Sequence, residues 1–162
     1  MQLRKVAFGL VVVASLSTLT ACGAGNNAAS RNISTVTDGA ESSVVTDTSQ
    51  LKLRGFLVVA QPDGSAVVVG TIVNDSVETE ALLGLSVNNT LANISSASNQ
   101  ILNGKPMIFE GASANAKAVI PATAGIKAGS NVEISFFFNN AGVVTVKAIA
   151  RDQRDTYAGV TA

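Results

Sequence analysis

The stretch VEISFFFNNAGVVTVKAIA, residues 132–150, decides the fold of this chain. In its first half, every second side chain is apolar and most of those between are polar. This two-residue period is that of a β-strand with one buried face. The predicted buried face holds Val132, Ile134, Phe136 and Phe138, and the opposite face holds Glu133, Ser135, Phe137 and Asn139. NNAG at 139–142 predicts a turn, after which VVTVKAIA resumes the alternation. The stretch therefore predicts a β-hairpin.

A second hairpin is predicted upstream, where LKLRGFLVVA (51–60) and SAVVVGTIVND (65–75) flank the turn QPDG (61–64). In such a turn proline presets φ, aspartate bonds to the local backbone and glycine accepts positive φ. Three shorter apolar runs follow without a helical stretch between them, namely ALLGLSV, KPMIFEG and AKAVIP. The pattern predicts an all-β fold, an immunoglobulin-like or cupredoxin-like β-sandwich, over residues 50–150.

The segment IPATAGIKAGSNVEISFFFNNAGVVTVKAIA (120–150) resembles the closing part of PCuAC-type periplasmic copper chaperones and of actinobacterial lipoproteins of the LpqE type. The hairpin PDGSAVVVGTIVND is similar to the actinobacterial group. The resemblance implies a cupredoxin-like or immunoglobulin-like sandwich in the cell envelope. Copper chaperones of this family hold Cu(I) with paired histidines and methionines. This chain has no histidine, and Met107 is its only methionine besides Met1, so no family ligand set can be carried over.

The residue counts exclude several classes of function. Eleven basic and eleven acidic residues give no net charge, whereas a nucleic-acid-binding protein needs a basic surplus. The absence of histidine removes the commonest general base and the commonest metal ligand. We therefore expect no enzyme activity, no resident cofactor and no nucleic-acid partner.

The N-terminus has the layout of a secretory signal, in which a basic start (Arg4, Lys5) precedes an apolar run over 6–16. The tetrad LTAC, residues 19–22, closely resembles a bacterial lipobox. In that family of signals the cysteine thiol receives a diacylglyceryl group, and cleavage makes the cysteine the first residue. The resemblance implies a lipoprotein signal peptide over 1–21 and a lipid-modified, palmitate-bearing Cys22.

The segment 22–49 is expected to be the lipid-bearing cysteine followed by a flexible linker, because it is rich in Gly, Asn, Ala, Ser, Thr and Asp without a regular period. Residues 43–46 within it could pair as an edge strand. Residues 151–162 form a polar C-terminal tail, predicted to be loosely held.

Other residues that could carry chemistry each have a plainer interpretation. Met107 could be a residual copper ligand, although a lone methionine beside Ile108 and Phe109 more often fills a core. Four carboxylates could gather around calcium, although a solvated turn is favoured; they are Asp63, Asp75, Glu78 and Glu80. Phe56 and Phe137 could form an exposed apolar patch, although burial between two sheets is preferred slightly.

The sequence thus predicts a membrane-anchored envelope lipoprotein on the extracytoplasmic face, held through Cys22. Its β domain is expected to be a non-enzymatic binding or structural module. The first alternative is a degenerate copper-chaperone-like protein that binds Cu(I) weakly through Met107. A further one is a subunit that docks another envelope protein.

Overall fold

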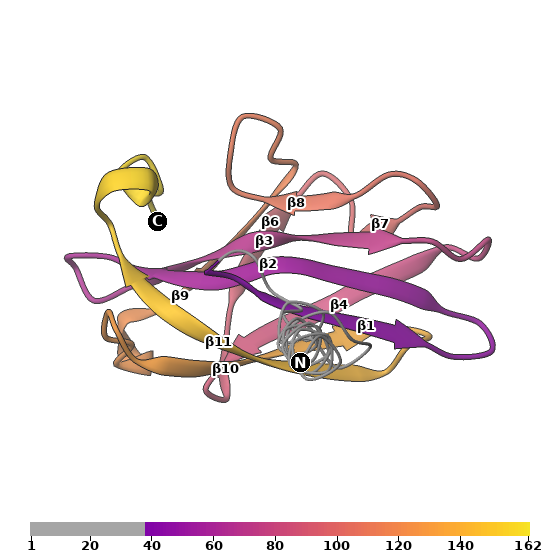
Figure 1. Cartoon of the computed structure of the whole chain (residues 1–162), viewed down its shortest axis with the longest axis horizontal. Coiled ribbons are helices and arrows are strands. Elements are labelled where there is room, and N and C mark those ends of the chain that lie inside the picture. Colours follow the sequence, from indigo (N-terminus) through magenta and orange to yellow (C-terminus); the bar gives the residue numbers. More distant parts are fainter. Residues whose placement is uncertain (1–37) are drawn as a thin grey trace, which may run out of the picture. The chain divides into compact units, whose positions relative to one another are not determined.

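The computed structural model describes residues 38–162, whose regular secondary structure is almost entirely β-strand (Figure 1). The predicted signal peptide and Cys22 lie outside these residues. No helix in the described part has the length and hydropathy needed to span a bilayer. The strands are β1 (Ala40–Val45), β2 (Gln50–Ala60), β3 (Ala66–Asn74), β4 (Glu80–Val87), β5 (Thr90–Leu91), β6 (Asn93–Ser96), β7 (Gln100–Ile101), β8 (Met107–Phe109), β9 (Ala116–Ile120), β10 (Asn131–Phe138) and β11 (Val143–Asp152). The other elements of the described residues are two 3-10 turns, η2 (Ala122–Ala124) and η3 (Asp155–Tyr157).

The strands form one strongly curled sheet in the order β5-β4-β10-β11-β2-β3-β8-β9-β6, with β1 paired to β2 and β7 paired to β4. β11 joins the two halves, because its first part pairs antiparallel with β10 while residues 150–152 pair parallel with β2. β5 and β6 stand at opposite ends of this order, yet only Ala92 separates them in the chain. The two halves therefore face one another across a shared core, as the predicted sandwich requires.

Both predicted hairpins are confirmed. β10 and β11 pair as antiparallel neighbours with Ile134 opposite Val146, and all four residues assigned to the inner face of β10 are buried. β2 and β3 pair across the turn at 61–65. In that turn the backbone N–H of Ser65 donates to the Asp63 carboxylate (2.9 Å), and Gly64 has a φ of 86°.

Phe56 lies at the centre of the core and is fully buried. Its ring centroid is 4.6 Å from that of Phe136 in an edge-to-face arrangement and 6.2 Å from that of Phe109. The pairing of β2 with β3 shifts register between Arg54 and Leu57, where Gly55 has a φ of 63°. This bulge turns the phenylalanine inward. Phe56 therefore belongs to the core and not to an exposed apolar patch.

The ordered domain begins earlier than the sequence predicted, because β1 lies within the range assigned to the linker. β1 overlaps the edge strand that the sequence allows at 43–46 and begins three residues before it. β1 runs antiparallel to β2, and Arg54 Nη1 binds Glu41 Oε2 at 2.7 Å. A side chain at Gly39 would place its Cβ 2.3 Å from the Gly55 backbone, so this approach requires glycine.

The C-terminal segment is also more ordered than a loose tail. β11 continues to Asp152, and η3 follows it. Gln153 Nε2 donates to the carbonyl oxygen of Val160 at 2.6 Å. Local hydrogen bonds of this kind hold the polar segment against the end of β11, which composition alone did not indicate.

Gly70→Ala tests the packing of Phe56. The new Cβ would lie 2.5 Å from the Phe56 ring, and Gly70 has a φ of 148°, which side chains disfavour. We expect a loss of roughly 3 kcal/mol in the free energy of unfolding, measured by urea denaturation. Gly159→Ala, where a Cβ meets open space, is the matched control and should change stability by less than about 0.5 kcal/mol. Equal stability of the two variants would contradict this account of the core.

Candidate functional site

Met107 is the residue that the sequence connected with copper, and the structure places it in the core. It lies on β8 opposite Ile72 of β3, with 4% of its surface exposed. In the described residues no three His, Cys, Asp or Glu side chains are grouped as metal ligands would be. A single buried thioether is a poor Cu(I) site, because such sites use several soft ligands. The core-filling interpretation accounts for its position.

A surface pocket of about 230 Å³ borders Met107. Its lining residues are Ser96, Ala97, Ser98, Gln100, Leu102, Lys105, Pro106, Met107 and Asn115. The Asn115 side chain is committed to the backbone, accepting from the N–H of Ile108 (2.8 Å) and donating to the Pro106 oxygen (2.9 Å). This asparagine therefore stabilises the β8–β9 connection, and its side chain gives no evidence that the pocket binds a ligand.

Glu80 is the most unusual ionisable group in the described domain, because only 1% of it is exposed. Its carboxylate accepts four hydrogen bonds of 2.9 Å; the donors are Ser49 Oγ and the backbone N–H groups of Ala81, Asn140 and Ala141. Burial raises the pKa of Glu80, but the hydrogen bonds led by that from Asn140 outweigh it, and the pKa lies below its usual value. The solvated turn predicted for Glu80 is therefore wrong.

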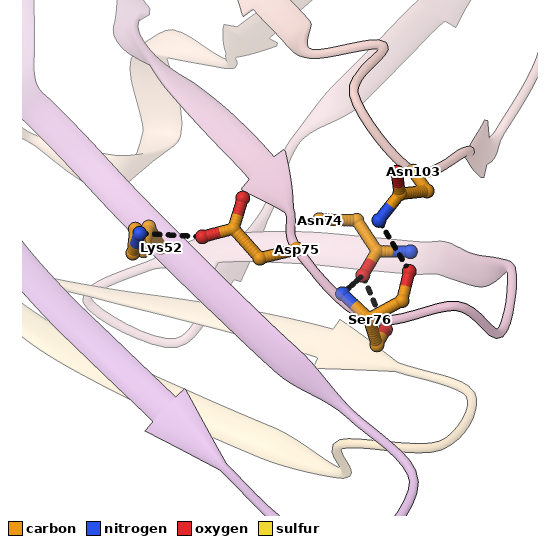
Figure 2. Close-up of polar contacts among 5 residues, drawn as sticks. All are labelled: Lys52, Asn74, Asp75, Ser76 and Asn103. Atoms are coloured by element: carbon orange, nitrogen blue, oxygen red, sulfur yellow. Dashed lines mark hydrogen bonds and ion pairs between the residues drawn. The ribbon is translucent and has the colours of Figure 1, made fainter.

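Asn74 organises the neighbouring loop in the same way. It is fully buried at the end of β3, and its Nδ2 donates to the carbonyl oxygens of Glu78 and Ile101, each at 2.8 Å. Its Oδ1 accepts from the backbone N–H of Ser76 at 2.9 Å and from the Ser76 hydroxyl. Asn103 Nδ2 donates to the backbone carbonyl oxygen of Ser76 at 2.8 Å, as Figure 2 shows. The loop after β3 is thus tied to the segment before β8.

The four carboxylates considered for calcium do not share a site. Asp75 pairs with Lys52 at 2.5 Å (Figure 2). The Asp63 carboxylate accepts hydrogen bonds from the hydroxyl and backbone N–H of Ser65, which lower its pKa. Glu78 is exposed, and Glu80 is saturated by the donors described above. Each carboxylate has its own surroundings, so these residues do not converge on an ion.

The two networks join four loops into one surface, which we call the loop platform: residues 46–49, 75–80, 102–105 and 139–142. Ser49 and the 139–142 turn both bind Glu80, and Asn140 Nδ2 also donates to Thr79 O at 3.2 Å. These loops lie together at the right-hand end of Figure 1, opposite the C-terminus. Sequence reasoning missed the platform, and only the position of Glu80 directly before an apolar run could have indicated it.

Comparison with known proteins identifies the fold. No protein-family model and no curated protein matches this chain. Among solved structures, the apo PCuAC domain from PmoF1 is similar with a TM-score of 0.56 and 20% identity, covering 69% of this chain and 98% of that one. The copper-bound PCuAC domain from PmoF2 is similar with a TM-score of 0.55 and 14% identity, and the match covers 69% of this chain and 97% of that one. The apo PCuAC domain from PmoF2 has a TM-score of 0.56 and 13% identity, and the match covers 70% of this chain and 98% of that one. The described domain therefore has the cupredoxin-like PCuAC fold.

Glu80→Gln tests the hydrogen bonds that close this end of the fold. The amide turns an –NH₂ group toward N–H donors, so we expect roughly 2–4 kcal/mol less stability at neutral pH. The pKa of Glu80 is lower in the folded state than its value of about 4.5 in the unfolded state. The ionised carboxylate therefore stabilises the fold at pH values above about 4.5, and this stabilisation is lost as the pH falls through the folded-state pKa. The variant should therefore lose less stability than wild type on acidification. Urea unfolding across that pH range measures both effects, and Glu78→Gln is the exposed control. A variant as stable as that control would contradict the role given to Glu80.

Proposed function

We propose that this chain is a lipoprotein anchored through Cys22 to the extracytoplasmic face of the cell membrane. Its β domain acts there as a non-enzymatic binding module. Support for the anchor comes from the tetrad at 19–22 and from the basic and apolar segments before it. Two or three acyl chains, at about 0.8 kcal/mol per buried methylene, bind a membrane firmly, whereas one chain is marginal.

The observation that carries the binding function is the use of Glu80. A buried carboxylate in a PCuAC-like fold is an obvious candidate for chemistry, yet here it is occupied by four donors of its own chain. It fixes loops, and with its oxygens occupied it is not free to act as an acid or a base. Since the chain also has no histidine, neither Ser-His-Asp nor Cys-His catalysis is available to it. A rigid set of loops is suited to recognition.

Cys22→Ser tests the anchor. Serine cannot form the thioether, so we expect the variant to move almost entirely from the membrane fraction to the soluble fraction. Intact-mass measurement should show that the lipid mass is missing. Thr20→Ser, which keeps the thiol and the tetrad, should remain lipidated and sediment with membranes. A Cys22→Ser protein that still sediments with membranes would contradict the lipid anchor.

The second candidate function, weak Cu(I) binding, is favoured by the likeness to a copper-bound PCuAC domain. Met107 is the only thioether in the described residues, and it is buried. We expect a Cu(I) competition titration of residues 38–162 to show only weak binding that Met107→Leu leaves unchanged. Leucine fills a similar volume, so the variant should fold. Stoichiometric tight binding that is lost in Met107→Leu would establish the copper function in place of the proposed one.

A further inference from the structure

The end of the domain that holds the loop platform presents four exposed apolar side chains, two on the platform and two on the strand ends next to it. Val77, at the tip of the β3–β4 loop, is 93% exposed, and Val45, just before the β1–β2 turn, is 74% exposed. Val143 follows the β10–β11 turn at 65%, and Leu102 precedes β8 at 37%. Of the large apolar residues exposed in the described part, only Leu83 and Leu91 on β4 and β5 lie elsewhere. Apolar groups gathered in this way at one end of a soluble domain indicate an interaction surface.

These side chains stand on a rigid base. Glu80 ties the turn before β2, the start of β4 and the β10–β11 turn, while Asn74 ties the β3–β4 loop to Ile101. Loops held by buried hydrogen bonds lose little conformational freedom when a partner binds. The polar networks therefore preorganise the positions at which the apolar side chains are presented.

The charge around these side chains identifies the kind of partner. Asp47 and Glu78 are exposed beside Val45 and Val77, and the one exposed base of the platform is Lys105. Asp75 and Lys52 neutralise one another, and Glu80 has no cationic partner among its contacts. The exposed charges of the platform are therefore two carboxylates and one ammonium group, next to apolar side chains. A complementary surface has an apolar centre and a rim of Lys or Arg.

A membrane surface fits this end of the domain poorly. Anionic headgroups repel carboxylates next to the valines. Proteins that insert at a bilayer interface also use Trp and Tyr, but this chain has no tryptophan, and its one tyrosine, Tyr157, is at the opposite end. The chain enters the domain before Ala40, and β1 then runs about 20 Å toward the platform. Ala40 is thus at the end of β1 away from the platform.

We propose that the loop platform is a docking site for a protein that presents basic side chains around an apolar patch. This inference rests on the proposed binding function and assigns its surface. Val77 contributes the central apolar contact, and Asp47 and Glu78 provide the charges that steer and orient the partner.

The experiment uses the full chain in its own membranes, with a photo-crosslinking amino acid at position 77 and, in a separate protein, at position 91. Leu91 is 66% exposed and lies off the platform, so the probe at position 91 measures non-specific crosslinking at an exposed position. We expect the probe at 77, and not the probe at 91, to join one protein, which mass spectrometry identifies. The crosslinked peptide of that protein should contain Lys or Arg.

The identified protein is then purified and bound to the full chain in detergent. Val77→Ser should weaken binding roughly tenfold through the lost apolar contact. Glu78→Lys should slow association and reduce its dependence on salt, whereas Leu91→Ser should change neither. Full chain carrying Cys22→Ser is mixed with anionic lipid vesicles in parallel, and we expect no binding.

Two results would overturn the platform while leaving the binding function intact. One is a partner crosslinked from position 91 whose affinity Val77→Ser leaves unchanged. The other is vesicle binding by Cys22→Ser chain that Val77→Ser removes, which would make the platform a membrane contact. Cu(I) binding lost in Met107→Leu would overturn the proposed function itself, so the two failures are distinguishable.

Discussion

The close approach of Phe56 to Gly70 is the constraint on which the rest of the domain depends. β2 must break its register at Gly55 to turn Phe56 inward, and β3 must provide a residue without a side chain where the ring arrives. Phe136 then meets the ring edge-to-face from the opposite half of the sheet. A bulge, a glycine and two aromatic rings thus position the halves of the sandwich, and β11 can pair with both β10 and β2 only when those halves are in place.

One end of this sandwich is closed by polar groups, which is uncommon for a position beside an apolar core. Glu80 and Asn74 are buried, and each makes several hydrogen bonds to backbone groups of other loops. A buried carboxylate is costly unless donors surround it, and here four donors do. The result is a set of loops with fixed geometry, which is a property of binding surfaces. The same arrangement leaves Glu80 without the free acid–base chemistry of an active site.

The PCuAC fold and the chemistry of this chain point in different directions. One solved structure with a similar fold is a copper-bound domain. In the described residues of this chain, the one methionine, Met107, packs in the apolar core. Function resides in sites and not in folds, so the architecture is compatible with a different ligand. The exposed apolar side chains distinguish this end from the rest of the described domain, because four of the six large ones lie on or next to the loop platform.

The two hairpins could be predicted from the sequence, because the alternation of side chains and the turn residues depend only on residues that are close together in the chain. The absence of histidine, and hence of the family's copper ligands, was equally decided by the sequence. The core position of Met107 agrees with the interpretation that the sequence favoured. Tertiary structure alone decided that Glu80 is buried and that β1, from Ala40, belongs to the domain. Glu80 meets its donors 31 and 60 residues away, and such contacts leave no local period to recognise. Whether a carboxylate is solvated or buried depends on which distant backbone N–H groups surround it, and only the folded chain brings these together.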